Sequence, residues 1–387
     1  MKKLILKRCT RGIFLSLPLI CSCATENSIR SSLPADVALN DVTRTGKLIV
    51  MLRLEGGDEL PFYIDTGSPI TVFDKSLEPK LGQRLANAKI SNFGAKTEGG
   101  FYKAPRLYLG DTLLMMSGKG VVTWDCKSRS ASVGSPIMGI LGMDVLKHYC
   151  VQLDFAAGKM RFLNPRQLKR AKLGKAFPIS FSSEDQGMKG FTRPFIHNRS
   201  LIGGEGTRVL IDTGYPADAA VESFRREIVE HRLRAEDVVH GHNGRIWFPK
   251  CAWNDETYTN LLVGEGANLI GLRFLARHLV TLDFPGRTMY LQQTRVGSWT
   301  NENMNEAEAF LNKLKEKGQL PGWSKNDEGA IYCQASPDLD EFDGRKNSDS
   351  SNYHYYVART SENNSWKLQK AWRADEDDNM IEEFSVP

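Results

Sequence analysis

Two aspartates stand at the ends of apolar runs, and each is followed by Thr and Gly. Asp65 follows the run 61–64 and Asp212 follows the run 209–211. Burying a lone carboxylate is unfavourable, so each aspartate is expected to have a partner. Two carboxyl groups held close together share one proton, because ionising both is costly. Such a pair can act as general base and general acid in one reaction.

The surroundings of the two aspartates repeat as well. Residues 56–67, GGDELPFYIDTG, align without a gap with residues 203–214, GGEGTRVLIDTG. Downstream, ILGMDVLKHYCVQLDF at 140–155 aligns with LIGLRFLARHLVTLDF at 269–284. A lone Asp-Thr-Gly is a weak signal, whereas two copies with the same flanking blocks indicate a duplicated unit.

The shared glycines of the downstream blocks are Gly142 and Gly271. They follow the aspartates at 77 residues in the first copy and 59 in the second, which indicates loops inserted into the first. Each precedes a Leu-Asp-Phe ending, whose Asp lies 12 residues further on in both copies. The shared register predicts that both copies form the same elements.

Each copy is predicted to be rich in strands with little helix. The run 47–54 predicts a strand that turns at 56–58 into a second strand, 60–64. The blocks at Gly142 and Gly271 predict a short helix feeding a strand, Val151–Phe155 in one copy and Val280–Phe284 in the other. Other helices are expected near 75–85 and over 217–234, where the apolar spacing is helical.

With these motifs, the sequence resembles the aspartic proteases, in particular a fused, two-lobed form of the retroviral-protease-like unit. The resemblance is carried by Asp65-Thr66-Gly67-Ser68, by Asp212-Thr213-Gly214 and by the apolar-apolar-Gly segments ending at Gly142 and Gly271. It covers roughly residues 45–293. It implies a mainly β fold of two homologous retropepsin-like acid-protease lobes related by a pseudo-twofold axis. The implied divisions are lobe 1 at 45–165, a connector at 166–190 and lobe 2 at 191–293.

The resemblance also implies roles for the residues beside each aspartate. Thr66 and Thr213 are expected to brace the two loops by hydrogen bonds. Gly67 and Gly214 are expected to let backbone amides approach the carboxylates. The Ser68 hydroxyl is expected to bond the outer oxygen of Asp65. The segments ending at Gly142 and Gly271 are expected to cross behind the loops and support them.

The activity implied is that of an aspartic-type endopeptidase acting on a peptide or protein. The Asp65/Asp212 dyad would activate a water to hydrolyse a peptide bond, with no metal, no cofactor and no covalent intermediate. The second lobe departs from the family pattern at Tyr215, where Ser, Thr or Ala is usual. The alternative is therefore a catalytically impaired bilobal protein that binds peptides or a protein partner between its lobes.

Three other features of the sequence suggest weaker alternatives. Family members close the cleft with a hairpin flap, for which 91–102 and 240–248 are candidates, with ordinary exposed hairpins as the alternative. A zinc site at His231, His240 and His242 lacks a convincing carboxylate ligand. A serine hydrolase is disfavoured because Ser135 lies outside any Gly-x-Ser-x-Gly motif.

The N-terminus is typical of an export signal. Residues 1–23 carry basic residues first and then the short apolar stretch Ile13–Ile20. The ending Ile-Cys-Ser-Cys resembles a bacterial lipobox, with Cys23 as the lipid-bearing residue, and ordinary signal-peptidase cleavage near Ala24 is the alternative. A linker, 24–44, would follow. The expected location is the cell envelope, lipid-anchored at the bacterial outer membrane or in the periplasm.

The net charge bears on which partners the chain could bind. The formal net charge is +5, and residues 1–23 carry five positive charges and no negative ones, so their removal leaves zero. Nothing then indicates nucleic-acid binding. Membrane contact is expected through the N-terminal lipid only, and the chain is expected to be a monomer.

The remaining features are four cysteines and a distinct C-terminal region. The cysteines could pair in three ways or remain buried thiols, and the sequence does not separate these. Residues 294–387 are expected to form a small α+β unit with a helix at 305–317 and a β-meander of three strands. The acidic cluster 375–378 is expected to be a solvated turn rather than a calcium site. The cysteines are Cys126, Cys150, Cys251 and Cys333.

Overall fold

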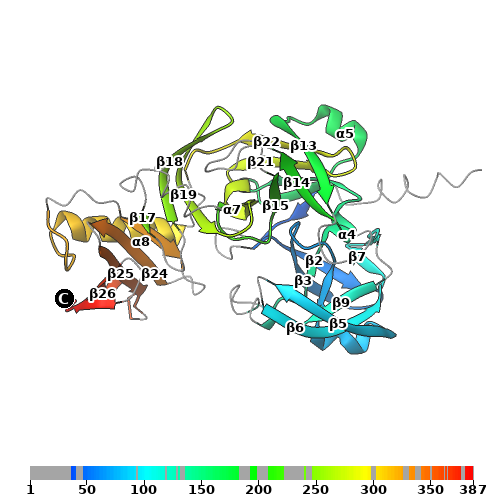
Figure 1. The fold of residues 1–387 in the computed structure, drawn as a ribbon, viewed down its shortest axis with the longest axis horizontal. Coiled ribbons are helices and arrows are strands. Elements are labelled where there is room, and N and C mark those ends of the chain that lie inside the picture. Colours follow the sequence, from blue (N-terminus) through cyan, green and yellow to red (C-terminus); the bar gives the residue numbers. More distant parts are fainter. Residues whose placement is uncertain are drawn as a thin grey trace, which may run out of the picture.

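The protein is described from a computed structural model, and the described part of the chain is mainly β. Its strands form three sheets of 13, nine and five strands (Figure 1). The described residues are 36–40, 47–92, 95–117, 120–127, 130, 136–182, 192–197, 208–221, 239–240, 246–297, 302–325, 331–335, 341–348, 351–360, 362–363, 365–375 and 380–386.

The nine-stranded sheet belongs to the first repeat, and its order is β5-β6-β9-β4-β10-β3-β2-β7-β8. Alternation decides its inner face: β2 buries Val50, Leu52 and Leu54 and exposes Met51. The predicted strand pair and the turn between them are confirmed. The strands are β2 (Ile49–Leu54), β3 (Glu59–Ile64), β4 (Val72–Asp74), β5 (Arg84–Asn92), β6 (Ala95–Lys103), β7 (Leu107–Leu109), β8 (Thr112–Leu113), β9 (Gly120–Trp124) and β10 (Gly139–Leu141).

The 13-stranded sheet combines strands of both repeats in the order β1-β12-β11-β21-β22-β13-β14-β15-β20-β16-β19-β18-β17. The predicted connector contains β13, which joins this sheet. The strands are β1 (Val37–Ala38), β11 (Cys150–Asp154), β12 (Lys159–Phe162), β13 (Lys175–Ser182), β14 (Arg193–His197), β15 (Arg208–Asp212), β16 (Ala219–Val221), β17 (Val239–His240), β18 (Ile246–Trp253), β19 (Glu256–Glu265), β20 (Leu269–Gly271), β21 (His278–Asp283) and β22 (Thr288–Gln293).

The two repeats and the segment between them contain four short helices among the described residues. The helix expected near 75–85 is a 3-10 helix, η1 (Lys75–Lys80), which begins where the Asp74 side chain accepts a hydrogen bond from the Ser76 amide. The helix after each shared glycine is confirmed, as are the strands β11 and β21 that follow. These helices are α4 (Met143–Leu146) and α7 (Leu272–Leu275), and α5 (Pro165–Arg170) precedes β13.

The two repeats meet where β11 pairs antiparallel with β21. Gln152 lies directly opposite Thr281, and the aligned blocks place these two residues at the same position of the repeat. Antiparallel strands have a local twofold axis between directly opposed residues. The repeats are therefore related by a local twofold at this pair, where the Gln152 Nε2 donates to the Thr281 Oγ1 at 2.9 Å.

The strands around each aspartate have the same arrangement in both repeats. In the first, β10 pairs parallel with β3 and antiparallel with β4. In the second, β20 pairs parallel with β15 and antiparallel with β16. Next, β4 pairs parallel with β9 as β16 pairs parallel with β19. Each aspartate loop thus connects two strands that lie on opposite sides of a central strand. The central strand is β10 in the first repeat and β20 in the second.

The helix predicted over 217–234 is wrong at its start. Residues Ala219–Val221 form strand β16, which lies between β19 and β20. Pairing on both sides outweighs the helical spacing of these small apolar side chains, because it satisfies their backbone groups inside the sheet. Residues 222–234 lie outside the described part of the chain.

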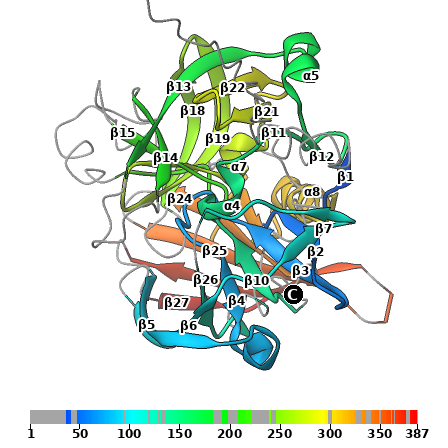
Figure 2. The ribbon, with the colours of Figure 1, turned by 90° about the vertical axis from the view of Figure 1, so that its right-hand side faces the viewer.

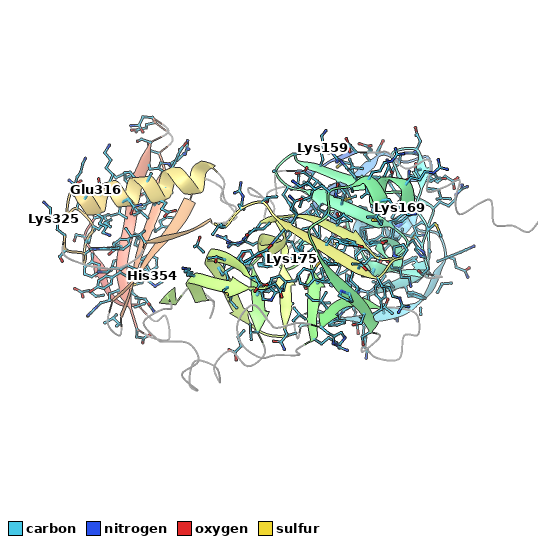
Figure 3. The ribbon with its side chains drawn as sticks, turned by 90° about the horizontal axis from the view of Figure 1, so that it is seen from above. Lys159, Lys169, Lys175, Glu316, Lys325 and His354 are labelled. Carbon is cyan, nitrogen blue, oxygen red and sulfur yellow. The ribbon has the colours of Figure 1, made fainter. Side chains whose placement is uncertain are left out.

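The C-terminal region consists of a helix on a β-meander. The predicted helix and three strands are present, and two further strands, β23 and β24, precede those three. Helix α8 (Glu302–Glu316) buries Ala307 and Leu311 against Tyr355 and Val357 of the sheet. Figure 3 shows this helix, with Glu316 at its end, along one face of the sheet. The strands are β23 (Tyr332–Ala335), β24 (Glu341–Ser348), β25 (Ser351–Arg359), β26 (Trp366–Ala374) and β27 (Met380–Phe384), in that order.

The buried apolar side chains form two main hydrophobic cores. One large cluster contains residues of both repeats, from Leu48 to Leu291, and another belongs to the C-terminal unit. Among the described residues, no helix combines the length and apolarity needed to span a membrane. The repeats thus share one core, and the C-terminal unit has its own.

Candidate active site

The structure brings Asp65 and Asp212 together where β3 and β15 end. The glycine segments run beside these strands: the Asp65 amide donates to the Leu141 carbonyl at 3.1 Å, and Asp212 is paired with Gly271. Both aspartates therefore leave buried strands at the same point of the repeat. Their loops face each other across the local twofold.

Reciprocal hydrogen bonds between Thr66 and Thr213 tie the two loops. Each threonine amide donates to the other threonine's Oγ1 at 3.0 Å. Each hydroxyl then donates into the opposite strand, Thr66 to the Ile211 carbonyl at 2.6 Å and Thr213 to the Ile64 carbonyl at 2.9 Å. Both threonines are buried. These bonds fix the distance between the loops and make the arrangement symmetric.

The backbone amides that follow each aspartate bind its inner oxygen. Asp65 Oδ1 accepts from the amides of Gly67 and Ser68 at 2.8 and 3.1 Å. Asp212 Oδ1 accepts from the amides of Gly214 and Tyr215 at 2.9 and 3.1 Å. These contacts orient both carboxyl groups and leave the outer oxygen of each for other partners.

The two loops approach so closely that only glycine fits at their tips. A Cβ on Gly67 would lie 2.6 Å from the Asp212 Cγ, and a Cβ on Gly214 would lie 2.4 Å from the Asp65 Cγ. Such distances are shorter than real Cβ contacts. Each carboxyl group therefore lies against the opposite glycine, which places the two carboxyl groups side by side.

The pair holds a proton with unusual strength. Asp212 is only 6% exposed. Burial, the charge of Asp65 and a hydrogen bond between the two carboxyl groups raise the pKa of Asp212 well above its ordinary range. The pair is thus singly protonated when Asp65 is ionised, which is the form that acid and base chemistry require.

The glycine segments support the loops from behind. The amides of Met143 and Leu272, one residue beyond each shared glycine, donate to the carbonyls of Ser68 and Tyr215 at 2.9 and 2.8 Å. A Cβ on Gly142 would lie 2.5 Å from the Ile70 backbone, and one on Gly271 would lie 2.2 Å from the Ala217 carbonyl. Both glycines are therefore required by close backbone approach.

One expected contact is wrong. The Ser68 hydroxyl donates to the Ile70 carbonyl at 2.7 Å, not to Asp65. The outer oxygen, Oδ2 of Asp65, instead accepts from the Tyr63 hydroxyl at 3.3 Å. The sequence contained a signal for this contact, because residues two apart on a strand share a face. Tyr63 lies two residues before Asp65.

A second contact had no signal in the sequence. Lys47 is buried, and its Nζ donates to the Gly214 carbonyl at 3.1 Å. Its ammonium also stands 5.5 Å from the centre of the Tyr63 ring. Lys47 precedes the first strand of one repeat but contacts the aspartate loop of the other, so only the packed structure reveals it.

Tyr215 leaves the loop geometry intact. Its amide binds Asp212 at the same 3.1 Å as the Ser68 amide binds Asp65. Its ring packs against buried apolar residues of the second repeat. These residues are Phe195, Leu210, Ala217, Ala220, Leu262 and Leu269.

The two flap candidates are found as hairpins of unassigned role. Strands β5 and β6 pair from Asn92–Ala95 to Arg84–Tyr102 at the edge of the nine-stranded sheet. In the view of Figure 2 they lie at the bottom, and α5 lies at the top. In the other candidate, β17 pairs with β18. The hairpin tips at 93–94 and 241–245 lie outside the described residues.

Several candidate residues also lie outside the described part of the chain: Cys23, Ser135, His231, His242, the side chains of His240 and Cys333, and 376–378 of the acidic cluster. The other three cysteines are thiols, so the disulfides left open by the sequence do not form among them. Burial raises the pKa of Cys150 to about 12 and that of Cys251 to about 11, which keeps both protonated.

A cavity of about 210 Å³ lies elsewhere, beside the shared sheet and α5. Its lining includes Tyr149, Phe162, Leu168 and Pro285, and none of its lining residues belongs to the two aspartate loops.

Comparison with known proteins adds no relative: no protein-family model matches the chain, and no curated protein is significantly similar to it. The geometry of the aspartate pair is therefore the basis for assigning a function.

Proposed function

We propose that this chain is an aspartic-type endopeptidase in which Asp65 and Asp212 activate a water molecule. The observation that carries the proposal is the pair of reciprocal Thr66–Thr213 hydrogen bonds, which hold the two carboxyl groups side by side in equivalent loops. A turn-capping role would account for one such aspartate. It gives no reason for two loops from distant parts of the chain to interlock around them.

We further propose that the two repeats are retropepsin-like lobes. The matching order of parallel and antiparallel strands around each aspartate supports this, as does the equivalent pairing of Gln152 with Thr281. The lobes would then share the sheet that contains β11 and β21. A peptide would bind across the two loops, in contact with both aspartates.

The chemistry follows from the singly protonated pair. Asp65 is the base, because its carboxylate accepts three hydrogen bonds and is half-buried, whereas Asp212 is buried and holds the proton. The water oxygen attacks the peptide carbonyl carbon and gives a proton to Asp65. Asp212 gives its proton to the carbonyl oxygen, which forms a tetrahedral diol.

Collapse of the diol completes the reaction. The peptide nitrogen takes the proton from Asp65, a hydroxyl of the diol returns its proton to Asp212, and the carbon–nitrogen bond breaks. The products are a carboxylic acid and an amine, and the pair again holds one proton. Water supplies the added oxygen and hydrogen atoms, so no oxidant, metal or covalent intermediate enters the balance.

The proposal can be tested with a peptide that contains a hydroxyl group in place of the scissile carbonyl. This group mimics the diol and needs one ionised and one protonated carboxyl. We expect it to raise the melting temperature of the protein, and the effect to be lost in Asp65→Asn and Asp212→Asn. A parent that binds the mimic but cleaves no peptide would instead support the impaired, peptide-binding alternative.

We also propose that the protein is exported and anchored through a lipid on Cys23, on the basis of the lipobox-like ending at 20–23. A lipid supplies the free energy of membrane binding. Cys23→Ser should therefore move the protein from the membrane to the soluble fraction of the expressing cells. Unchanged fractionation would refute the anchor.

A further inference from the structure

A buried cation and a buried phenol lie behind the aspartate pair, and the loop framework just described does not account for them. Lys47 is 5% exposed and Tyr63 is 1% exposed. Lys47 Nζ donates to the Gly214 carbonyl at 3.1 Å, and the Tyr63 hydroxyl donates to Asp65 Oδ2 at 3.3 Å. The lysine ammonium also lies over the tyrosine ring, at 5.5 Å from its centre.

The phenol makes the two carboxyl groups unequal. The aligned repeats place Leu210 at the position of Tyr63, and leucine has no donor. Asp65 therefore has three donors, the amides of Gly67 and Ser68 and the Tyr63 hydroxyl. A hydrogen bond to the ionised form of a carboxyl group favours that form. Tyr63 thus gives one carboxyl group of the pair a donor that the other lacks, which favours the proton on Asp212.

The lysine acts by its charge. A positive charge near a carboxyl pair favours each step in which the pair loses a proton. Burial acts in the opposite direction, because it disfavours the charged forms. In this protein the charge of Lys47 lowers the pKa of Asp212 and partly opposes the effect of burial. By strand register, half-buried Arg193 is the counterpart of Lys47 in the second repeat.

We propose that Lys47 and Tyr63 are positioning residues that set where the shared proton sits and the pH range over which the aspartate pair holds one proton. The consequence for peptide hydrolysis rests on the proposed function. Lys47 and Tyr63 are the charged or titratable side chains described in direct contact with the tips of the two loops. Further along the loops, Asp144 accepts from the Thr71 hydroxyl at 2.7 Å, and Asp218 forms ion pairs with Arg273 and Arg277.

The two residues act on different limits of that range. The acid limit is the pH at which the doubly protonated pair loses its first proton. The alkaline limit is the pH at which the pair loses its second proton. The Tyr63 hydrogen bond to the Asp65 carboxylate is present both when the pair holds one proton and when it holds none. Tyr63→Phe should therefore raise the acid limit and leave the alkaline limit in place. The Lys47 charge favours both losses, so Lys47→Met should raise both limits.

The experiment compares full-length variants by two measurements. The first is the pH profile of kcat/KM for a cleaved peptide. The second is an infrared difference titration, which distinguishes a protonated carboxyl from a carboxylate and requires no activity. The band of the pair is identified by its loss in Asp212→Asn. Thermal melts confirm that each variant is folded.

We expect Lys47→Met to raise both limits by about one pH unit, a tenfold change in proton affinity. Lys47→Gln should do the same, although glutamine can still donate to the Gly214 carbonyl. Lys47→Arg, which keeps the charge, should leave both limits close to those of the parent. Lys103→Met is the matched control, since Lys103 is exposed on β6, and it should change neither.

The outcomes separate this inference from the proposed function. If the parent cleaves peptides but folded Lys47→Met and Lys47→Gln leave both limits unchanged, the role of the lysine is refuted. An unchanged acid limit in Tyr63→Phe refutes the role of the tyrosine. If the parent cleaves nothing, the proposed function fails, and the infrared titration still decides the inference.

Discussion

At the scale of single residues, the site depends on how closely two short loops approach. Gly67 and Gly214 each lie against the carboxyl group of the other loop. The threonines that follow the aspartates bind each other and the opposite strand. The two glycines and the reciprocal threonine hydrogen bonds together fix the position of the two carboxyl groups relative to each other.

The first prediction concerns these glycines. Gly67→Ala or Gly214→Ala should force the loops apart and lower the free energy of unfolding by about 1–3 kcal/mol, with loss of any peptide cleavage. Gly57→Ala is the matched control, because its Cβ would make only ordinary contacts, the nearest at 3.5 Å. Urea unfolding measures the difference. Equal stability of Gly57→Ala and Gly67→Ala would contradict the close approach.

The second prediction concerns pH. The raised pKa of Asp212 means that the folded protein keeps a proton that the unfolded chain loses at lower pH. Stability therefore falls as pH rises between the unfolded and folded pKa values. Asp212→Asn removes this titration, so its stability relative to the parent should increase from mildly acidic to neutral pH. Urea unfolding across that range tests this, and a difference independent of pH would contradict it.

At the scale of elements, the pairing of β11 with β21 fixes the two repeats relative to each other. Gln152 and Thr281 occupy equivalent positions of the repeat and are hydrogen-bonded in the middle of this pair. Both side chains are buried. A buried polar group that loses its partner is destabilising, whereas replacing both partners by apolar groups is much less so.

The third prediction uses this difference. Gln152→Leu alone should lower the free energy of unfolding by about 1–3 kcal/mol, because the Thr281 hydroxyl stays buried without that donor. Adding Thr281→Val should recover part of the loss. A double-mutant cycle by urea unfolding measures the coupling. Additive effects would show that the hydrogen bond contributes nothing to joining the repeats.

The sequence predicted the elements whose signal is local. The strands beside each aspartate, the short helices after Gly142 and Gly271, and α8 all follow from turns and apolar spacing. Residues 219–221 were misassigned to a helix, because small apolar side chains suit either structure and sheet pairing decides. Strand β24 was not predicted, because its residues EFDGRKNS show little apolar alternation.

The candidate site was predictable only in part. The two aspartates, their threonines and the glycines were found because they repeat. Tyr63 has no counterpart in the second repeat, and Lys47 reaches a loop 167 residues away. The Tyr63 contact follows from strand alternation but has no repeated copy that would single it out. The Lys47 contact depends on how the two repeats pack, which short sequence patterns do not encode.

At the scale of the whole molecule, the repeats and the C-terminal unit have separate cores. In the described residues the two parts approach where β17 lies beside β24 (Figure 1). The aspartate pair lies entirely within the repeats. The C-terminal unit is therefore not required to build it.

The fourth prediction follows from this separation. A chain ending at residue 297 should fold and keep the dyad, so its kcat/KM for short peptides should stay within about twofold of that of the full chain. The thermal melt of the full chain should contain a transition that the shortened chain lacks. A shortened chain that fails to fold would show that the C-terminal unit is part of the same cooperative structure.

The most direct test of the account is cleavage of a mixed peptide library by the parent, Asp65→Asn and Asp212→Asn, followed by mass spectrometry from mildly acidic to neutral pH. An amide fills the same space as a carboxyl group but cannot share the proton of the pair or accept one from water. We predict that the parent cleaves peptides and that each folded variant loses about a thousandfold in rate, the order expected when an acid–base group is removed. Retained cleavage in both variants would contradict the dyad.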